Sequence, residues 1–139
     1  MKIFIPVKPI SLNACETTSG KFRHKSTRWK IWKKQIDPFL EEHSLKLSKF
    51  ANEFDSTKKI EASYVFNLDN MLVKGGERKG KINLRAGDID NFVKPITDVL
   101  FKKMAEQNPF IEDAHIIKMT VEKKQTKNSG MHIEYKLIW

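Results

Sequence analysis

Alternating apolar and polar residues predict four strands along the chain. They are the segments 2–8, which stops before Pro9, 59–68, 115–124 and 131–139. A period of two is typical of a strand that buries one face. The last two segments are separated only by the turn-forming residues 126–130, which predict a β-hairpin between them.

Apolar residues at three- and four-residue spacing predict three helices. The first begins after Ser26 or Thr27, and the dipeptide Asp37-Pro38 is expected to end it and to start a second helix that continues to about Ala51. The third lies within 85–101 and ends by Asn108-Pro109; its apolar face is formed by Phe92, Ile96, Val99 and Leu100. The segment 11–27 lacks periodicity and is interpreted as a loop.

This order of elements predicts the fold class. Strand, helices, strand, helix and hairpin describe an α/β (α+β) fold in which helices pack against a small mixed sheet. A chain of 139 residues is long enough to bury one hydrophobic core but not two, so we expect a single domain over 1–139. Trp29 and Trp32 fall on one helical stripe and are assigned to that core rather than to base stacking.

Composition narrows the choice of partner. The chain has 26 lysines and arginines against 17 aspartates and glutamates, which gives a formal charge of +9 and a pI of about 9.6. Such a balance favours an anionic partner, and nucleic acid is the commonest one. No apolar run approaches the roughly eighteen residues of a membrane span, and the first residues lack the apolar core of a signal peptide. We therefore expect a cytoplasmic protein with no membrane partner.

Cysteine and histidine chemistry receives little support from the sequence. Cys15 is the only cysteine, which excludes an internal disulfide and fits a reducing compartment. The four histidines are scattered, which argues against a zinc site. The spacing of these residues does not exclude a catalytic pair of Cys15 with a histidine. Nothing in the sequence around Cys15, however, indicates an activated thiol.

The largest cluster of candidate catalytic residues lies at the start of the third predicted helix. Asp88, Asp90, Lys94 and Asp98 stand at intervals of two, four and four, so a helix aligns the last three on one face. Neighbouring carboxylates repel one another unless a cation neutralises them. Magnesium fits, because it is held by one or two carboxylates and takes its other oxygens from water and a substrate phosphate. A structural interpretation stays open, in which Asp88 is a turn residue and Asp90 or Asn91 caps the helix.

Basic residues gather in two segments that are predicted to contact a phosphate backbone. The segment 70–87 combines glycine with Lys74, Arg78, Lys79, Lys81 and Arg85 directly before the acidic pair. Lysine and arginine supply the sequence-independent part of nucleic-acid binding. The segment 11–27 contributes Lys21, Arg23 and Lys25, for which a merely solvated loop is an equal alternative.

The motif D-x-D-N-x-x-K over 88–94, followed by Asp98 and later by Glu112-Asp113, resembles the RusA family of Holliday junction resolvases. The N-terminal residues 9–13 and the basic stretch up to Trp29 are similar to the corresponding segments of that family. The order of elements agrees over nearly the whole chain. One difference is that Ala86-Gly87 separates Arg85 from the first aspartate, where familiar members can carry an arginine run.

The resemblance implies a homodimeric endonuclease that nicks two opposed strands of a four-way DNA junction and depends on Mg²⁺, with Mn²⁺ as a possible substitute. It assigns metal binding and catalysis to Asp88, Asp90 and Asp113, and a catalytic role near the scissile phosphate to Lys94; roles for Asp98 and Glu112 stay open. Two alternatives remain: an inactive or accessory DNA-binding protein of the same fold, and a metal-dependent nucleotide-sugar transferase, in which D-x-D also occurs. The transferase would need a longer chain and would leave the charge unexplained.

Overall fold

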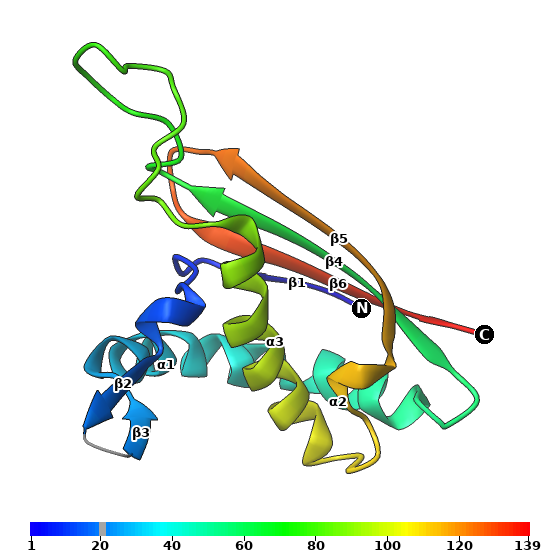
Figure 1. The fold of residues 1–139 in the computed structure, drawn as a ribbon. Coiled ribbons are helices and arrows are strands. Elements are labelled where there is room, and N and C mark those ends of the chain that lie inside the picture. The colour runs from blue at the N-terminus through cyan, green and yellow to red at the C-terminus, as the bar shows by residue number, and fades with distance from the viewer. Residues whose placement is uncertain (20–21) are drawn as a thin grey trace.

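A mixed sheet of four strands forms one layer of the protein (Figure 1). The computed structural model describes residues 1–19 and 22–139. The strands are β1 (Lys2–Ile5), β4 (Lys59–Leu68), β5 (Ile116–Gln125) and β6 (Gly130–Ile138), in the order β1-β6-β4-β5. Strand β6 is antiparallel to β1 and β4, and β5 is parallel to β4. The predicted fold class, helices against a small mixed sheet, is confirmed.

The predicted hairpin between the last two strands is wrong. Ala62 of β4 pairs with Met119 of β5 on one side and with Tyr135 of β6 on the other, so β4 lies between the two strands. The residues after β5 cross the end of β4, where the amide of Thr126 donates to the carbonyl of Leu68 across 2.9 Å. Turn-forming residues show that the chain reverses, but they do not show which strand occupies the space between.

The helices of the described residues cover one face of the sheet (Figure 1). They are α1 (Thr27–Glu42), α2 (Ser44–Glu53) and α3 (Ile89–Ala105). The predicted cap is confirmed, because the hydroxyl of Ser26 accepts from the amide of Trp29. No helix in the described ranges is long and apolar enough to cross a membrane.

The predicted break at Asp37-Pro38 is wrong, because α1 continues through Pro38 to Glu42. Its buried stripe runs from Trp32 and Ile36 to Leu40, across the proline. A proline inside a helix costs about 3 kcal/mol, which burial of two large apolar side chains can offset. Asp37 is therefore not an N-cap; its carboxylate pairs with Lys33 one turn earlier.

The segment 11–27 contains more structure than predicted. A 3₁₀ turn η1 (Leu12–Ala14) precedes two short antiparallel strands, β2 (Glu16–Ser19) and β3 (Phe22–Lys25). Thr17 pairs with His24, and both are exposed. A ladder with polar residues on both faces has no apolar alternation, so the sequence pattern could not reveal it. Lys21 lies outside the described residues.

The hydrophobic core lies between the sheet and the helices. Alternate residues of β4 from Ile60 to Leu68 are buried, and they face the buried stripe of α3. The ring of Phe66 lies 5.5 Å from that of Phe92 between centroids. Deeper in, the hydroxyl of Tyr64 lies 2.7 Å from that of Thr97 and 2.8 Å from that of Tyr135. Helix α3 is thus fixed to the sheet by both apolar packing and a buried chain of hydroxyls.

Candidate active site

The start of α3 is shaped by a glycine. Gly87 has a φ of +107°, and an added Cβ would lie 2.5 Å from the ring of Phe92. Only glycine adopts this conformation without strain, and here it also allows the close approach of the aromatic ring. The ammonium of Lys123 donates to the carbonyl of Gly87 across 3.1 Å. This turn determines where the next residue, Asp88, leaves the loop.

Asp88 occupies the N-cap position of α3, with φ −83° and ψ 142°. Its carboxylate caps no helix N–H in the part of the chain that the structure describes. The structural interpretation in which Asp90 or Asn91 caps the helix is wrong, because α3 already begins at Ile89. An exposed carboxylate at a helix N-terminus, without a capping bond, remains available to another ligand.

The predicted acidic and basic face of α3 is present. Asp90 lies in the first turn, Lys94 one turn later, and Asp98 one turn beyond that. The ammonium of Lys94 lies 2.7 Å from Oδ1 of Asp98. All three side chains are exposed, whereas the opposite face of the helix packs into the core.

Asp113 reaches this face from another part of the chain. It begins the 3₁₀ turn η2 (Asp113–His115), directly before β5. The buried Ile111 anchors the preceding residues, and the amide of Glu112 donates to Nδ1 of His115 across 3.3 Å. Lys94 donates to Oδ2 of Asp113 across 3.2 Å. The structure therefore brings Lys94 and Asp113 together although they are far apart in sequence.

Lys94 remains charged in this setting. Its hydrogen bond to Asp98 is the main reason that the pKa of the ammonium group is raised above its ordinary value. The bond to Asp113 acts in the same direction, and partial burial opposes both. A lysine whose pKa is raised cannot serve as a general base near neutral pH, but it can offset negative charge on a phosphate.

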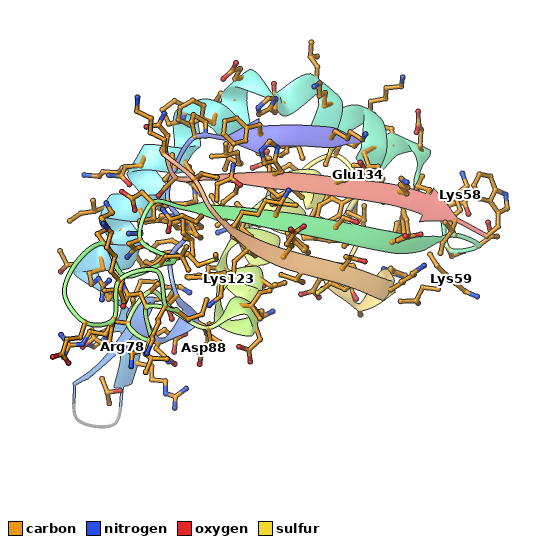
Figure 2. The ribbon with its side chains drawn as sticks, turned by 90° about the horizontal axis from the view of Figure 1, so that it is seen from above. Lys58, Lys59, Arg78, Asp88, Lys123 and Glu134 are labelled. Atoms are coloured by element: carbon orange, nitrogen blue, oxygen red, sulfur yellow. The ribbon has the colours of Figure 1, made fainter. Side chains whose placement is uncertain are left out.

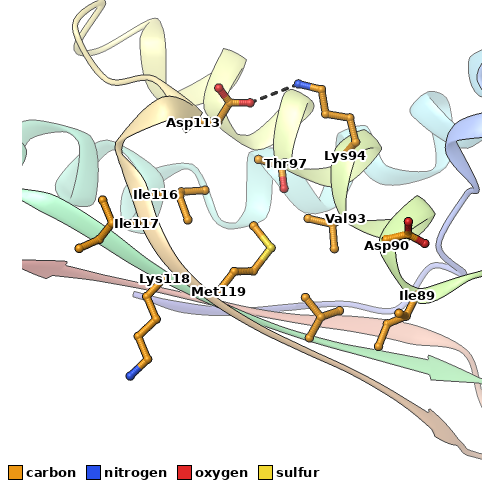
Figure 3. A pocket seen from close by; sticks show the side chains of 11 residues that line it. Ile89, Asp90, Val93, Lys94, Thr97, Asp113, Ile116, Ile117, Lys118 and Met119 are labelled. Carbon is orange, nitrogen blue, oxygen red and sulfur yellow. Dashed lines mark hydrogen bonds and ion pairs between the residues drawn. The ribbon is translucent and has the colours of Figure 1, made fainter.

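The acidic and basic side chains of this region line a groove of about 500 Å³ (Figure 3). Its walls are the first turns of α3 and the beginning of β5, and Asp90, Lys94 and Asp113 all line it. Apolar side chains form the rest of the lining, among them Val93 and Met119. Thr97, only 3% exposed, also lines the groove and links it to the buried tyrosines.

Two of the three predicted metal ligands, Asp90 and Asp113, line this groove, and Asp88 is not among its lining residues. Asp88 and Asp90 lie at the beginning of α3, whereas Asp113 contacts Lys94 one turn further on. The described residues contain no compact group of three or more metal-binding side chains. The donors nonetheless fit magnesium, which prefers hard carboxylate oxygens, needs only one or two of them and completes its shell with water and phosphate. Convergence of all three carboxylates on one ion stays a prediction.

The basic segment before α3 extends away from the sheet (Figure 1). Its two arms pair at Leu72 and Ile82, and the amide of Val73 donates to the carbonyl of Lys81 across 2.9 Å. All five basic residues predicted there are exposed: Lys74, Arg78, Lys79, Lys81 and Arg85. Figure 2 shows Arg78 and Asp88 toward the same end of the molecule, and Lys58 and Lys59 toward the other. The segment is thus an exposed, paired extension on the side of the acidic residues.

The second predicted basic group lies on β3. Arg23 and Lys25 are exposed, and the ammonium of Lys25 stands 5.0 Å from the ring centre of Trp29. Trp29 is half-buried against the core, and Trp32 is buried and donates from Nε1 to the carbonyl of Lys8 across 3.0 Å. Both tryptophans therefore pack in the core, as predicted.

Comparison with protein families identifies the chain. The family model described as endodeoxyribonuclease RusA matches residues 6–136. The chain belongs to the RusA family. It is a Holliday junction endodeoxyribonuclease of that family, a hydrolase connected with DNA recombination and repair, and the family's nucleases are metal-dependent. The transferase and inactive alternatives are thereby set aside. Comparison with curated proteins gave no match.

Three residues of this RusA-family site were not found from the sequence: Gly87, Thr97 and Lys123. The glycine directly before the acidic motif was a usable signal, since glycine often marks a special backbone conformation. Thr97 lies one turn after Val93 on α3, but its position alone does not indicate a buried hydroxyl. Lys123 comes from β5 and reaches Gly87 only through the fold.

Cys15 takes no part in the site. It is buried, and its Sγ donates to the carbonyl of Ser11 across 3.4 Å. Burial raises the pKa of its thiol, which keeps it protonated near neutral pH. A Cys-His nucleophilic pair therefore receives no support from the structure.

Proposed function

We propose that this RusA-family nuclease makes paired, symmetric nicks in opposed strands of a four-way DNA junction in the cytoplasm, with Mg²⁺ as its ion and Mn²⁺ as a substitute. The observation that carries the proposal is a single exposed groove shared by Asp90, Lys94 and Asp113, with the basic extension beside it. The family match over residues 6–136 supports a single nuclease domain that spans residues 1–139.

Asp88, Asp90 and Asp113 are the residues that would hold the ion. A magnesium ion held there would supply Lewis-acid chemistry, polarising the phosphate and making a water molecule more acidic. The carboxylates supply negative oxygens for this purpose, and none of them is tied up in a helix cap. Asp90 and Asp113 line the groove and Asp88 directly precedes its lining residue Ile89, which suits a site that the DNA phosphate itself completes.

Lys94 would stabilise the transition state. Its ammonium is fixed between Asp98 and Asp113 and stays protonated, so it can offset the negative charge that develops on the phosphate. Asp98 would hold the lysine in position if Asp113 served as a metal ligand, because the contact of Lys94 with Asp98 is the shorter one, 2.7 Å against 3.2 Å to Asp113. This gives Asp98 a positioning role and leaves metal binding to the other three aspartates.

The basic extension would bind the DNA backbone. Its five exposed cations are Lys74, Arg78, Lys79, Lys81 and Arg85, and Arg23 and Lys25 add charge on β3. Cations of this kind give affinity that depends on salt and not on base sequence. Lys21 is assigned to the same surface from its sequence position alone.

A homodimer would supply the two active sites that paired nicks require. Strand β5 is at the end of the sheet, and its outer edge pairs with none of the described residues. Ile117 and Met119 are 59% and 44% exposed there, and they continue the apolar lining of the active-site groove. Exposed apolar edge strands are rarely left uncovered. A second copy packed on β5 would cover them and place two grooves close to a twofold axis.

The dimer is tested by sedimentation of Ile117→Glu and Met119→Glu variants. Burying a glutamate in an apolar interface is strongly unfavourable, so both variants should shift to monomers. Leu45→Glu is the matched control, because Leu45 is an 84% exposed apolar residue on helix α2 and not on the edge strand β5. A wild-type monomer, or variants that remain dimeric, would contradict this interface.

The activity is tested with purified protein on an end-labelled four-way junction beside a linear duplex of the same sequence. Nicks should appear in the junction when Mg²⁺ or Mn²⁺ is present and disappear when the ion is chelated. Cutting in excess chelator, or equal cutting of the duplex, would contradict the proposal.

A further inference from the structure

A lysine from strand β5 holds the backbone directly before Asp88. The ammonium of Lys123 donates to the carbonyl of Gly87 across 3.1 Å, and Figure 2 shows Lys123 and Asp88 in the same part of the molecule. The carbonyl of Gly87 and the amide nitrogen of Asp88 belong to one planar peptide unit. No backbone amide of the described residues donates to this carbonyl. Lys123 therefore determines the orientation of the peptide from which Asp88 begins.

The side chain of Lys123 starts beside the aromatic residues under this turn. Lys123 pairs with Phe66 of β4, so both side chains lie on the helix-covered face of the sheet. The ring of Phe66 lies 5.5 Å from that of Phe92, and Phe92 fills the space that a Cβ of Gly87 would occupy. Contacts thus run from Lys123 through two rings to Gly87, and the hydrogen bond returns to Lys123. A closed set of contacts of this kind fixes the start of α3 from below.

The ammonium of Lys123 binds the backbone and not a carboxylate. Lys123 is half-buried, and it takes part in none of the ion pairs formed by the described residues. Lys94 differs, because both of its contacts are carboxylates. Lysine is rarely buried without an acidic partner, so its placement here calls for a reason other than charge pairing. Lys123 holds the residue before Asp88 and leaves the Asp88 oxygens free for a cation.

We propose that Lys123 is a positioning residue for Asp88 and thereby sets the affinity of the active site for its metal ion. The inference rests on the proposed function, in which Asp88 is a metal ligand. Groups that hold a metal ligand in place typically contribute about 10- to 100-fold in metal affinity or activity. Lys123 acts through the carbonyl of Gly87, so this role requires no contact with DNA.

The sign of the effect separates positioning from simple electrostatics. An ammonium group near a divalent cation repels it, so loss of the charge alone would strengthen metal binding. Loss of positioning would weaken metal binding, because the peptide before Asp88 would no longer be held in one orientation. Lys123→Met removes the ammonium and keeps the apolar stem beside Phe66. Lys123→Arg keeps a charged N–H donor and should restore most of the metal affinity.

Metal binding is measured without DNA, through the paramagnetic broadening that Mn²⁺ causes in the amide NMR signals of Asp88 and Asp90. Lys123→Met should need about tenfold more Mn²⁺ than the wild type for equal broadening. Lys124→Met is the matched control, because Lys124 is the next residue on β5, is exposed and points to the opposite face of the sheet. The Mg²⁺ concentration for half-maximal nicking should rise in the same order, with junction affinity little changed.

Melting curves show whether each variant is folded. If Lys123→Met fails to fold, Lys123→Gln makes the same comparison with a polar side chain that is too short to reach the carbonyl of Gly87. Unchanged or tighter Mn²⁺ binding by a folded variant would overturn the inference and leave the proposed function intact. Weaker junction binding with unchanged Mn²⁺ binding would make Lys123 a contact for the DNA backbone, which also contradicts positioning.

A different result in the wild type would bear on the proposed function itself. If Mn²⁺ did not broaden the signal of Asp88 in the wild-type protein, Asp88 would not be a metal ligand, and the inference would fail together with that assignment. Nicking of the junction by the wild type in Mg²⁺ then decides separately whether the proposed nuclease activity stands.

Discussion

The ammonium of Lys94 donates to Oδ2 of Asp113 across 3.2 Å, joining the second turn of α3 to the turn that begins β5. The same ammonium contacts Asp98, so one lysine lies between a carboxylate of its own helix and a carboxylate from a distant segment. Lys94 thereby marks the place where the acidic motif and Asp113 meet.

Removing the charge of a single carboxylate should abolish cleavage. Asp88→Asn, Asp90→Asn and Asp113→Asn each keep the side-chain shape but lose the negative oxygen that a hard cation prefers. Junction affinity should persist, because the basic extension carries it. Rates in Mg²⁺ and gel-shift affinities measure the two effects separately. Glu106→Gln, an exposed change at the C-terminal end of α3, is the control, and wild-type nicking by any of the three aspartate variants would remove that residue from the site.

Truncating Lys94 should affect the rate far more than stability. Lys94→Ala is expected to lower the cleavage rate by about two to three orders of magnitude, the usual effect of one group aimed at a transition state. The ion pairs of Lys94 are exposed and contribute about 0–1 kcal/mol, so the melting temperature should change little. Lys94→Met, which keeps the apolar stem, should be as slow as the alanine variant. A large fall in melting temperature with an unchanged rate would make Lys94 a structural residue.

Gly87→Ala should impair both folding and cleavage. The positive φ and the contact with Phe92 strain any side chain at this position, which costs about 1–3 kcal/mol. Relief of the strain would move Asp88, so the cleavage rate should fall as well. At Gly75 an added Cβ meets no described atom within 4 Å, and Gly75→Ala is therefore the control for thermal unfolding. A Gly87→Ala protein that melts and cuts like the wild type would contradict this account of the turn.

In the folded protein, the two tyrosine hydroxyls should remain protonated at pH values above the ordinary pKa of tyrosine. Burial raises the pKa of Tyr64 and raises that of Tyr135 further, and these are the only tyrosines in the chain. Above a pH of about 10 the unfolded chain loses phenolic protons that the folded chain retains, so stability falls as pH rises. Absorbance at 295 nm should rise only together with the loss of circular dichroism. A phenolic titration near pH 10 in protein that is still folded would show that the hydroxyl chain under α3 is open to solvent.

Local features of the fold could be predicted from the sequence. Strand β4 begins and ends where its alternation does, at Lys59 and Leu68, because a central strand that buries one face has the clearest period. The polar face of α3 could also be predicted, since residues one turn apart in sequence are neighbours on a helix. In both cases the decisive neighbours lie within a few residues along the chain.

Long-range features could not be predicted in the same way. Pro38 indicated a break in the helix, but the buried stripe from Trp32 to Leu40 continues through it. Burial of these apolar side chains therefore outweighs the unfavourable helix propensity of proline. The contact of Lys94 with Asp113, and the position of β4 between β5 and β6, depend on how distant segments pack. Its place just before the predicted strand 115–124 and the family resemblance both made Asp113 a candidate, whereas the left-handed φ of Gly87 and the buried hydroxyl of Thr97 required the structure.

The most direct test of the central claim is to map the nicks on all four strands of a labelled junction at increasing salt. A charge of +9 gives some affinity for any DNA, so weak binding to a linear duplex does not discriminate. A twofold dimer that contacts four arms should keep its preference for the junction at salt concentrations that release the duplex. We predict nicks at symmetry-related positions in two opposed strands, with ends that DNA ligase seals. Nicks in one strand only, or equal cutting of the linear duplex at moderate salt, would contradict the account.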